Sequence, residues 1–150
     1  MWPLVRDRAG AFTLVMKASN SIVGGLAAFY DAFNSGSVDQ FSDALADTDG
    51  TSVIGSAPGE GHSDRASWIK TYAEMITPAG VRLRGGPSAR GFAHDGAGFV
   101  VDEPAFVLPD GSRLETRLTA VLIEEGGRWR VVHLHFSVGV PDEEAIRPPE

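Results

Sequence analysis

The sequence predicts an α+β fold in which helices cover one face of a strongly bent antiparallel sheet. Amphipathic helical patterns occupy the first half of the chain, up to about residue 80. β-rich runs separated by turn residues fill the second half, and the last two are joined by Glu124-Glu125-Gly126-Gly127, as in a long hairpin. Helices followed by an antiparallel meander segregate into layers. A sheet of this length tends to curl into a cone with a pocket beneath it.

Composition limits the classes of function. A chain of 150 residues with 43% hydrophobic and 22% charged residues fits one ordinary globular domain. The net charge of −7 disfavours nucleic acid and anionic membranes as partners. With no cysteine, the chain has no disulfide, thiolate metal site or cysteine nucleophile. Charged residues interrupt the N-terminal apolar run, and no apolar run reaches 18 residues. We therefore expect a cytoplasmic protein that does not span a membrane.

Three helices are predicted. The first runs from about Ser21 to Asn34, because its apolar residues recur at helical spacing. The second begins after Ser37, where Ser37-Val38-Asp39-Gln40 has a capping-box pattern. The third is capped by Ser63 or Asp64 and ends at Thr77-Pro78-Ala79-Gly80. One face of that third helix carries Trp68, Tyr72, Met75 and Ile76.

The strands are expected between turn signals. A short run at 52–55 precedes a Gly-rich loop, and four long strands follow the third helix. These four are expected at roughly 81–94, 98–108, 113–124 and 128–138.

Strand alternation assigns the residues of the last strand to two faces. One face carries Val132, Leu134 and Phe136, and the other carries Trp129, Val131, His133, His135 and Ser137. A short turn with a bulge at Gly126 or Gly127 would align Leu118, Ala120 and Leu122 with Leu134 and Phe136. A four-residue loop would instead place Arg113, Glu115 and Arg117 inside. We favour the first register because it leaves one face apolar.

Two stretches resemble a known family. The run Phe29-Tyr30-Asp31-Ala32-Phe33-Asn34-Ser35-Gly36-Ser37-Val38-Asp39 resembles the first-helix signature of the nuclear transport factor 2-like (NTF2-like) superfamily. The pattern Trp129-x-x-Val132-His133-x-His135-x-Ser137 resembles the closing strand of its SnoaL-like branch, and also that of the calcium/calmodulin-dependent kinase II association domain. The resemblance implies a cone-shaped, cystatin-like α+β domain over residues 20–140. Residues 1–19 are then an N-terminal extension, and residues 141–150 a mobile tail.

The best-known activity of the superfamily does not transfer to this chain. Ketosteroid isomerases carry an oxyanion-hole tyrosine on the first helix, and that position is Phe29 here, beside Tyr30. Their general-base aspartate falls near Gly55, and their protonated aspartate near Thr119. A proton-shuttling isomerase needs a carboxylate base and strong donors at these places. Steroid isomerase chemistry is therefore not expected.

The resemblance implies a small-molecule-binding protein with a mostly apolar pocket. Candidate reactions are those of a cyclase, isomerase or dehydratase acting on a polyketide- or terpene-like compound, with no cofactor. The alternative is a non-catalytic dimerisation or assembly module with a vestigial pocket. The expected pocket walls are Phe29, Tyr30, Trp68, Tyr72 and Phe136. Candidate acid or base residues are Glu60, His62 and Glu103, although a solvated turn is the simpler interpretation of Glu60 and His62.

The outer face of the sheet is the expected homodimer interface. An apolar face that the helices cannot cover favours symmetric burial, here with Trp129, Val131, His133 and His135. Charging these histidines at about pH 5 to 6 is expected to loosen the dimer. The pair His133 and His135 could also ligate a metal, but no third ligand stands at a recognisable spacing, so no metal is expected.

Overall fold

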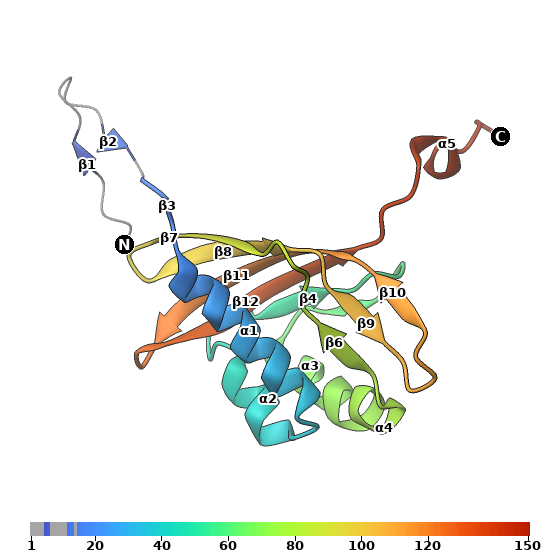
Figure 1. The fold of residues 1–150 in the computed structure, drawn as a ribbon, viewed down its shortest axis with the longest axis horizontal. Coiled ribbons are helices and arrows are strands. Elements are labelled where there is room, and N and C mark those ends of the chain that lie inside the picture. Colours follow the sequence, from blue (N-terminus) through green and yellow to red (C-terminus); the bar gives the residue numbers. More distant parts are fainter. Residues whose placement is uncertain (1–4, 7–11, 14) are drawn as a thin grey trace.

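The computed structural model describes residues 5–6, 12–13 and 15–150, in which helices pack on one side of a bent sheet around one core (Figure 1). Most of the predicted extension 1–19 lies outside the described residues. The helices are α1 (Asn20–Asn34), α2 (Val38–Ala44), α3 (Arg65–Thr71), the π-helical η1 (Tyr72–Ile76), α4 (Thr77–Ala79) and α5 (Asp142–Ala145). The strands are β1 (Val5–Arg6), β2 (Phe12–Thr13), β3 (Lys17–Ala18), β4 (Ser52–Ile54), β5 (Gly61–His62), β6 (Arg82–Arg84), β7 (Arg90–His94), β8 (Ala97–Asp102), β9 (Ala105–Val107), β10 (Arg113–Glu115), β11 (Arg117–Glu125) and β12 (Arg128–Ser137).

The main sheet has the order β3-β7-β8-β11-β12-β4-β5, and α1, α2 and α3 all lie on one of its faces (Figure 1). We call this the inner face and the opposite one the outer face. A second sheet, β10-β9-β6, continues the β8 and β11 strands after a bend. The bend lies where Glu103-Pro104 and Thr116 interrupt the pairing, and the Thr116 hydroxyl donates to the Pro104 carbonyl at 2.7 Å. The bent sheet confirms the predicted α+β cone.

Side-chain caps fix the helix starts. Ser19 caps α1, Ser37 caps α2 and Asp64 caps α3, each accepting a backbone N–H three residues on. The third predicted helix is not regular, because the Thr77 N–H bonds to the Tyr72 carbonyl five residues back, which produces the π-helical turn. Gly80, in the left-handed conformation, ends it.

Three of the four long predicted strands are each broken in two. The 81–94 run is broken at Gly85-Gly86-Pro87, where close packing leaves no room for a side chain: a Cβ at Gly85 would meet the Tyr30 ring at 2.9 Å. The other two breaks form the bend between the sheets. Local patterns predicted the β-rich second half of the chain, whereas β3 was not predicted, β5 lies where a loop was expected, and the bend depends on tertiary packing.

The predicted assignment of the residues of the last strand to two faces of the sheet is correct only for the C-terminal half of β12. Leu118 pairs with Phe136 and Ala120 with Leu134, as the short-turn register predicts. Gly126 and Gly127, both with positive φ, form a two-residue turn. The irregularity lies instead within β12, where Val121 pairs with His133 but Leu122 pairs with Val131.

The extra residue reverses the alternation for the start of β12. The placement of Trp129 and Val131 on the outer face is therefore wrong. Val131 is fully buried, and the Trp129 indole donates to the Ser21 hydroxyl of α1 at 2.8 Å. His133 and His135 do lie on the outer face, because their neighbour Leu134 is buried inside.

Candidate functional site: a cavity inside the cone

A small apolar cavity lies between the inner face of the sheet and the helices α1 to α3. Its volume is about 130 Å³. Residues from both sheets, from the helices and from the β4–β5 hairpin line it: Phe29, Phe33, Phe41, Val53, Gly55, Glu60, Gly61, His62, Trp68, Thr71, Tyr72, Ile76, Leu83, Phe106, Leu134 and Phe136. Five of these lining side chains carry a polar group: Glu60, His62, Thr71, the Trp68 indole and the Tyr72 hydroxyl.

Aromatic rings form the wall and hold one another in place. Phe41 stacks on Tyr72 with ring centroids 3.9 Å apart and planes 4° from parallel. The Trp68 and Phe41 rings are nearly perpendicular, with centroids 5.8 Å apart. The Tyr72 hydroxyl donates to the Phe33 carbonyl at 2.7 Å, so this polar group is satisfied within the wall. The wall is a packed, rigid surface that offers a ligand aromatic contacts and few hydrogen bonds.

The polar groups lie together at the β4–β5 edge of the cavity. Leu134 of β12 pairs with Val53 of β4, and Val53 pairs with His62 of β5. Since directly paired residues share a face of the sheet, this row places the His62 side chain on the inner side, next to the apolar wall. Glu60 precedes it in the same hairpin and is exposed.

Glu60 occupies the space over Gly55. The Gly55 N–H donates to the Glu60 carbonyl at 2.9 Å, and a side chain at position 55 would collide with the Glu60 carboxylate. Glycine at 55 therefore lets a carboxylate from the neighbouring strand lie over the end of β4.

His62 is anchored by the start of α3. Its Nδ1 lies 3.2 Å from the Ser67 hydroxyl, which lies 3.1 Å from Oδ2 of Asp64. The Ser67 backbone N–H also bonds Oδ1 of Asp64 at 2.8 Å. The backbone N–H and the hydroxyl of Ser67 together hold the pKa of the Asp64 carboxyl below its usual value. Asp64 is thus a stable carboxylate at neutral pH, one serine away from the imidazole.

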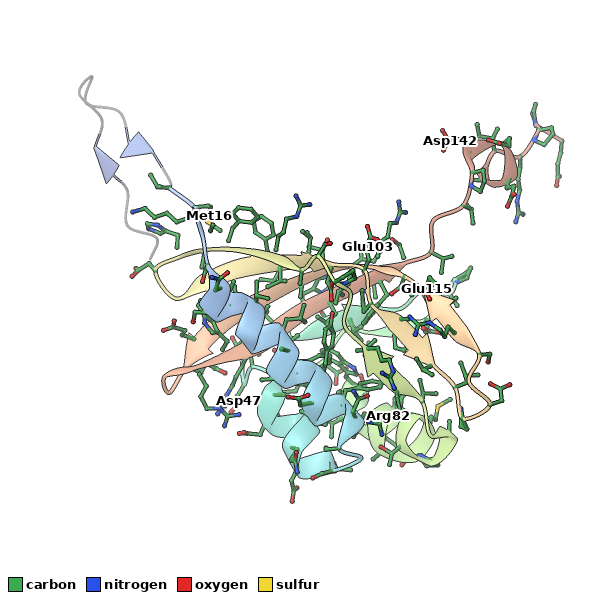
Figure 2. The ribbon with its side chains drawn as sticks, viewed as in Figure 1. Met16, Asp47, Arg82, Glu103, Glu115 and Asp142 are labelled. Carbon is green, nitrogen blue, oxygen red and sulfur yellow. The ribbon has the colours of Figure 1, made fainter. Side chains whose placement is uncertain are left out.

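A larger hollow of about 520 Å³ lies on the outer face. Its lining is mixed and strongly polar: Pro87, Ser88, Arg90, Val101, Asp102, Glu103, Arg117, Leu118, Thr119, His135 and Ser137. Figure 2 shows Glu103 on the side of the sheet away from the helices.

Comparison with known proteins places the fold. The family model of the SnoaL-like domain matches residues 25–141, which is more than half of the chain. The chain belongs to this family. No protein of curated function matches the sequence.

Solved structures similar to this SnoaL-like domain share its fold at low sequence identity. An NTF2-like protein of unknown function from Pseudomonas putida aligns with a TM-score of 0.66 and 14% identity, over 85% of this chain and 94% of that one. An NTF2-like protein from Streptomyces avermitilis, provisionally named a dehydratase, gives 0.65 and 16%, over 81% and 95%. A protein from Thiobacillus denitrificans, provisionally named a calcium/calmodulin-dependent protein kinase type II association domain, gives 0.63 and 20%, over 79% and 94%.

The SnoaL-like domain brings together most of the predicted pocket residues. Phe29, Trp68, Tyr72 and Phe136 line the cavity, together with Glu60 and His62. Glu103 does not: it lies on the outer hollow, because the strand turns at Pro104. Tyr30 is also absent from the cavity lining.

Tyr30 instead bonds a buried acid. Its hydroxyl donates to Oδ2 of Asp102 at 2.7 Å, and the Gly86 N–H donates to the same oxygen at 3.1 Å. Burial, followed by the hydrogen bond to Asp102, raises the pKa of Tyr30 far above its usual value of 10.0. Oδ1 of Asp102 is buried without a hydrogen-bond partner among the described residues. No pattern in the sequence predicts that Tyr30 and Asp102 are hydrogen-bond partners.

Metal clusters and membrane-spanning helices are both absent from the residues that the structure describes. No group of three or more His, Asp or Glu side chains in this part of the chain could hold a metal ion. No helix there is long and apolar enough to cross a membrane.

Proposed function

We propose that this SnoaL-like domain binds a compact apolar molecule in the cone cavity and exchanges a proton with it through Glu60 and His62. The observation that carries the proposal is the register that sets His62 in one row with Leu134 and Val53, so that an imidazole and a carboxylate lie at the edge of an otherwise apolar cavity. A carboxylate and an imidazole side by side are suited to general acid–base catalysis.

The cavity volume limits the ligand. A dry apolar cavity of about 150 Å³ accommodates benzene, and the cavity here measures about 130 Å³. Typical pockets for larger ligands reach roughly 300–1,000 Å³. The ligand is therefore one apolar ring or a branched chain of that size. Alternatively, one end of a larger polyketide- or terpene-like molecule occupies the cavity, and the rest of that molecule extends out of it past Glu60 and His62.

The proposed chemistry is isomerisation or dehydration. Glu60 or Nε2 of His62 removes a proton from a carbon next to a carbonyl and, once protonated, returns it to a second carbon or to a departing hydroxyl, which leaves as water. Glu60 lies over Gly55. The resemblance to ketosteroid isomerases puts their general-base aspartate near that same position. The provisional name of the Streptomyces avermitilis protein is in keeping with dehydration.

A thermal-shift screen tests the binding site. The panel comprises single-ring and fused-ring alcohols and ketones. A ligand present at about 100 times its Kd stabilises the protein by about 2.7 kcal/mol, which should raise the Tm by roughly 5–10 °C. The Val53→Phe variant fills the cavity and should abolish the shift. Ile54→Phe is the matched control, because Ile54 is the next residue of the same strand, is 46% exposed and faces outward. Equal loss of the shift in both variants, or no shift in wild type, would contradict the proposal.

A second function is favoured by one observation. Phe41 and Tyr72 stack in the wall, and the cavity of about 130 Å³ is smaller than typical ligand pockets of roughly 300–1,000 Å³, as expected of an assembly module whose pocket is vestigial. If the domain is such a module, no member of the panel raises the Tm, and variants of Glu60 and His62 behave like the wild type in the same screen.

We also propose a homodimer through the outer face. Paired residues form a largely apolar row across it, with Phe92 beside Phe99 and Phe99 beside Val121, and Val121 is 36% exposed. The helices α1 to α4 lie on the inner side of the sheet, and α5 stands apart from it (Figure 1). A second copy of the same face would bury this row.

A further inference from the structure

We infer that Ser67 and Asp64 are positioning residues that hold neutral His62 as the Nδ1–H tautomer and so leave Nε2 as a proton acceptor. The inference rests on the proposed function for its catalytic meaning, but its structural content does not depend on any ligand.

The Ser67 hydroxyl has a single proton and several neighbours that could accept it. Oδ2 of Asp64 lies at 3.1 Å, the Asp64 carbonyl at 3.2 Å and Nδ1 of His62 at 3.2 Å. A hydrogen bond to an ionised carboxylate is stronger than one to a neutral acceptor, and Ser67 itself helps to keep Asp64 ionised. The serine proton therefore goes to Asp64.

The direction of that bond decides the state of the imidazole. With its proton on the carboxylate, the Ser67 oxygen can only accept from Nδ1, so Nδ1 must carry a hydrogen. In neutral His62 the lone pair then lies on Nε2. Among the described residues no hydrogen bond is recorded to Nε2, so this nitrogen is the one left for a ligand in the cavity that His62 lines.

The proton balance is simple. Nε2 accepts a proton from a C–H or O–H group of the ligand, and the electron pair of that bond stays on the ligand. The imidazolium keeps its Nδ1–H on Ser67, and Ser67 keeps its proton on Asp64. No proton leaves the chain of three residues, whose negative end stabilises the imidazolium.

His133 provides an internal contrast. Its Nδ1 lies 2.8 Å from the Ser52 hydroxyl, a geometry close to that of His62 and Ser67. Among the described residues, however, no acid or other acceptor is recorded for the Ser52 proton. Ser52 is therefore free to donate to Nδ1, and His133 should carry its hydrogen on Nε2. The carboxylate behind the serine is the difference between the two pairs.

Long-range proton–nitrogen NMR of the imidazole rings at about pH 8.5, where neutral histidine prevails, tests the inference on the full chain without ligand. The His62→Gln variant assigns the signals of His62 among the 4 histidines. We expect Nδ1–H for His62 and Nε2–H for His133. Ser67→Ala should shift His62 to the Nε2–H form, while Ser67→Thr should keep Nδ1–H.

Asp64→Asn is the second variant, because asparagine still caps a helix but carries no charge. It should weaken the Nδ1–H preference with the fold intact. An Nε2–H form of His62 in wild type, or an unchanged tautomer in both Ser67→Ala and Asp64→Asn, would overturn the inference. Since no ligand is present, that result would leave the proposed binding site standing. Conversely, a failed ligand screen with the expected tautomers would remove the proposed function alone.

Discussion

The inner and outer faces of the same sheet carry two hollows that differ in size and in chemistry. The outer hollow measures about 520 Å³ and is bordered by Arg90, Arg117 and Glu103 among other polar side chains. The inner cavity measures about 130 Å³ and has polar groups mainly along one edge. If volume alone marked a binding site, the outer hollow would be the choice.

We propose the inner cavity as the ligand site because the apolar chemistry of its lining outweighs the difference in volume. Each Å² of apolar surface that binding removes from water contributes roughly 25 cal/mol to the binding free energy. The inner cavity offers mostly aromatic and aliphatic side chains to an apolar ligand, whereas the outer hollow surrounds it with charged and other polar side chains as well. The outer hollow is better suited to contact with a second protein surface, where its charges of both signs can pair across a two-fold axis.

The largest expected effect comes from the inner wall. Phe41 is fully buried and stacked on Tyr72, so Phe41→Ala should lower the free energy of unfolding by about 3–5 kcal/mol. Val121→Ala on the outer face removes a side chain that is 36% exposed, and at a concentration where the protein is monomeric it should cost less than about 1 kcal/mol. Urea denaturation measures both. Equal losses would mean that the two faces are equally buried in solution.

The second effect tests the hydrogen bond between Tyr30 of α1 and Asp102 of β8. Tyr30→Phe leaves Oδ2 of Asp102 with only the Gly86 N–H, and it should cost about 1–3 kcal/mol. Because the pKa of Tyr30 is raised on folding, the folded state keeps its proton longer than the unfolded state does. The contribution of Tyr30 is therefore complete below pH 10.0 and is lost as the pH rises above that value. Wild type should lose stability in that alkaline range more steeply than Tyr30→Phe. Parallel pH profiles would show that Tyr30 titrates normally.

The third effect tests the outer face as an interface. Val121→Arg should raise the dissociation constant of the homodimer by tenfold or more, which is at least about 1.4 kcal/mol. Met75→Arg is the matched control, because Met75 is 65% exposed on η1 on the helical side of the domain and gains the same charge. Analytical ultracentrifugation at neutral pH compares them. A wild-type monomer at micromolar concentration would remove the proposed interface.

The smallest effect on stability is expected at the cavity edge. Glu60 is exposed, so Glu60→Gln should change the free energy of unfolding by no more than about 0.5 kcal/mol. The same variant should slow exchange of an acidic C–H proton of a bound ketone for deuterium by about 10²-fold. Proton NMR of the ketone follows this exchange. Exchange at the wild-type rate would show that Glu60 takes no part in proton transfer.

Sequence patterns predicted the parts of the fold that local chemistry controls. The caps Ser37 and Asp64 and the two-residue glycine turn at 126–127 require specific side chains or backbone angles, and those residues are visible in the sequence. The register of Leu118 with Phe136 followed from the same turn and from burial of one face. Cavity residues such as Trp68 and Tyr72 were predictable because a helix stripe facing a curved sheet forms both core and pocket wall.

The remaining features depend on contacts between distant residues. The bulge at Val132 leaves no local signal, yet it turns Trp129 and Val131 toward α1. The bond between Tyr30 and Asp102 joins residues 72 positions apart in the chain, so no spacing rule predicts it. Ser67 behind His62 was missed because a serine in the first turn of a helix is common. Its role depends on where the β4–β5 hairpin places the imidazole.

Mapping a screening hit by NMR titration tests most directly whether the inner cavity is the small-molecule site. If the ligand lies in the cavity, we expect saturable shifts of the Trp68 indole N–H and of the methyl groups of Val53 and Leu134, all of which line it. The methyl groups of Val101 and Thr119, which line the outer hollow, should not shift. Saturable shifts confined to Val101 and Thr119, or none for any member of the panel, would mean that the inner cavity is not the small-molecule site.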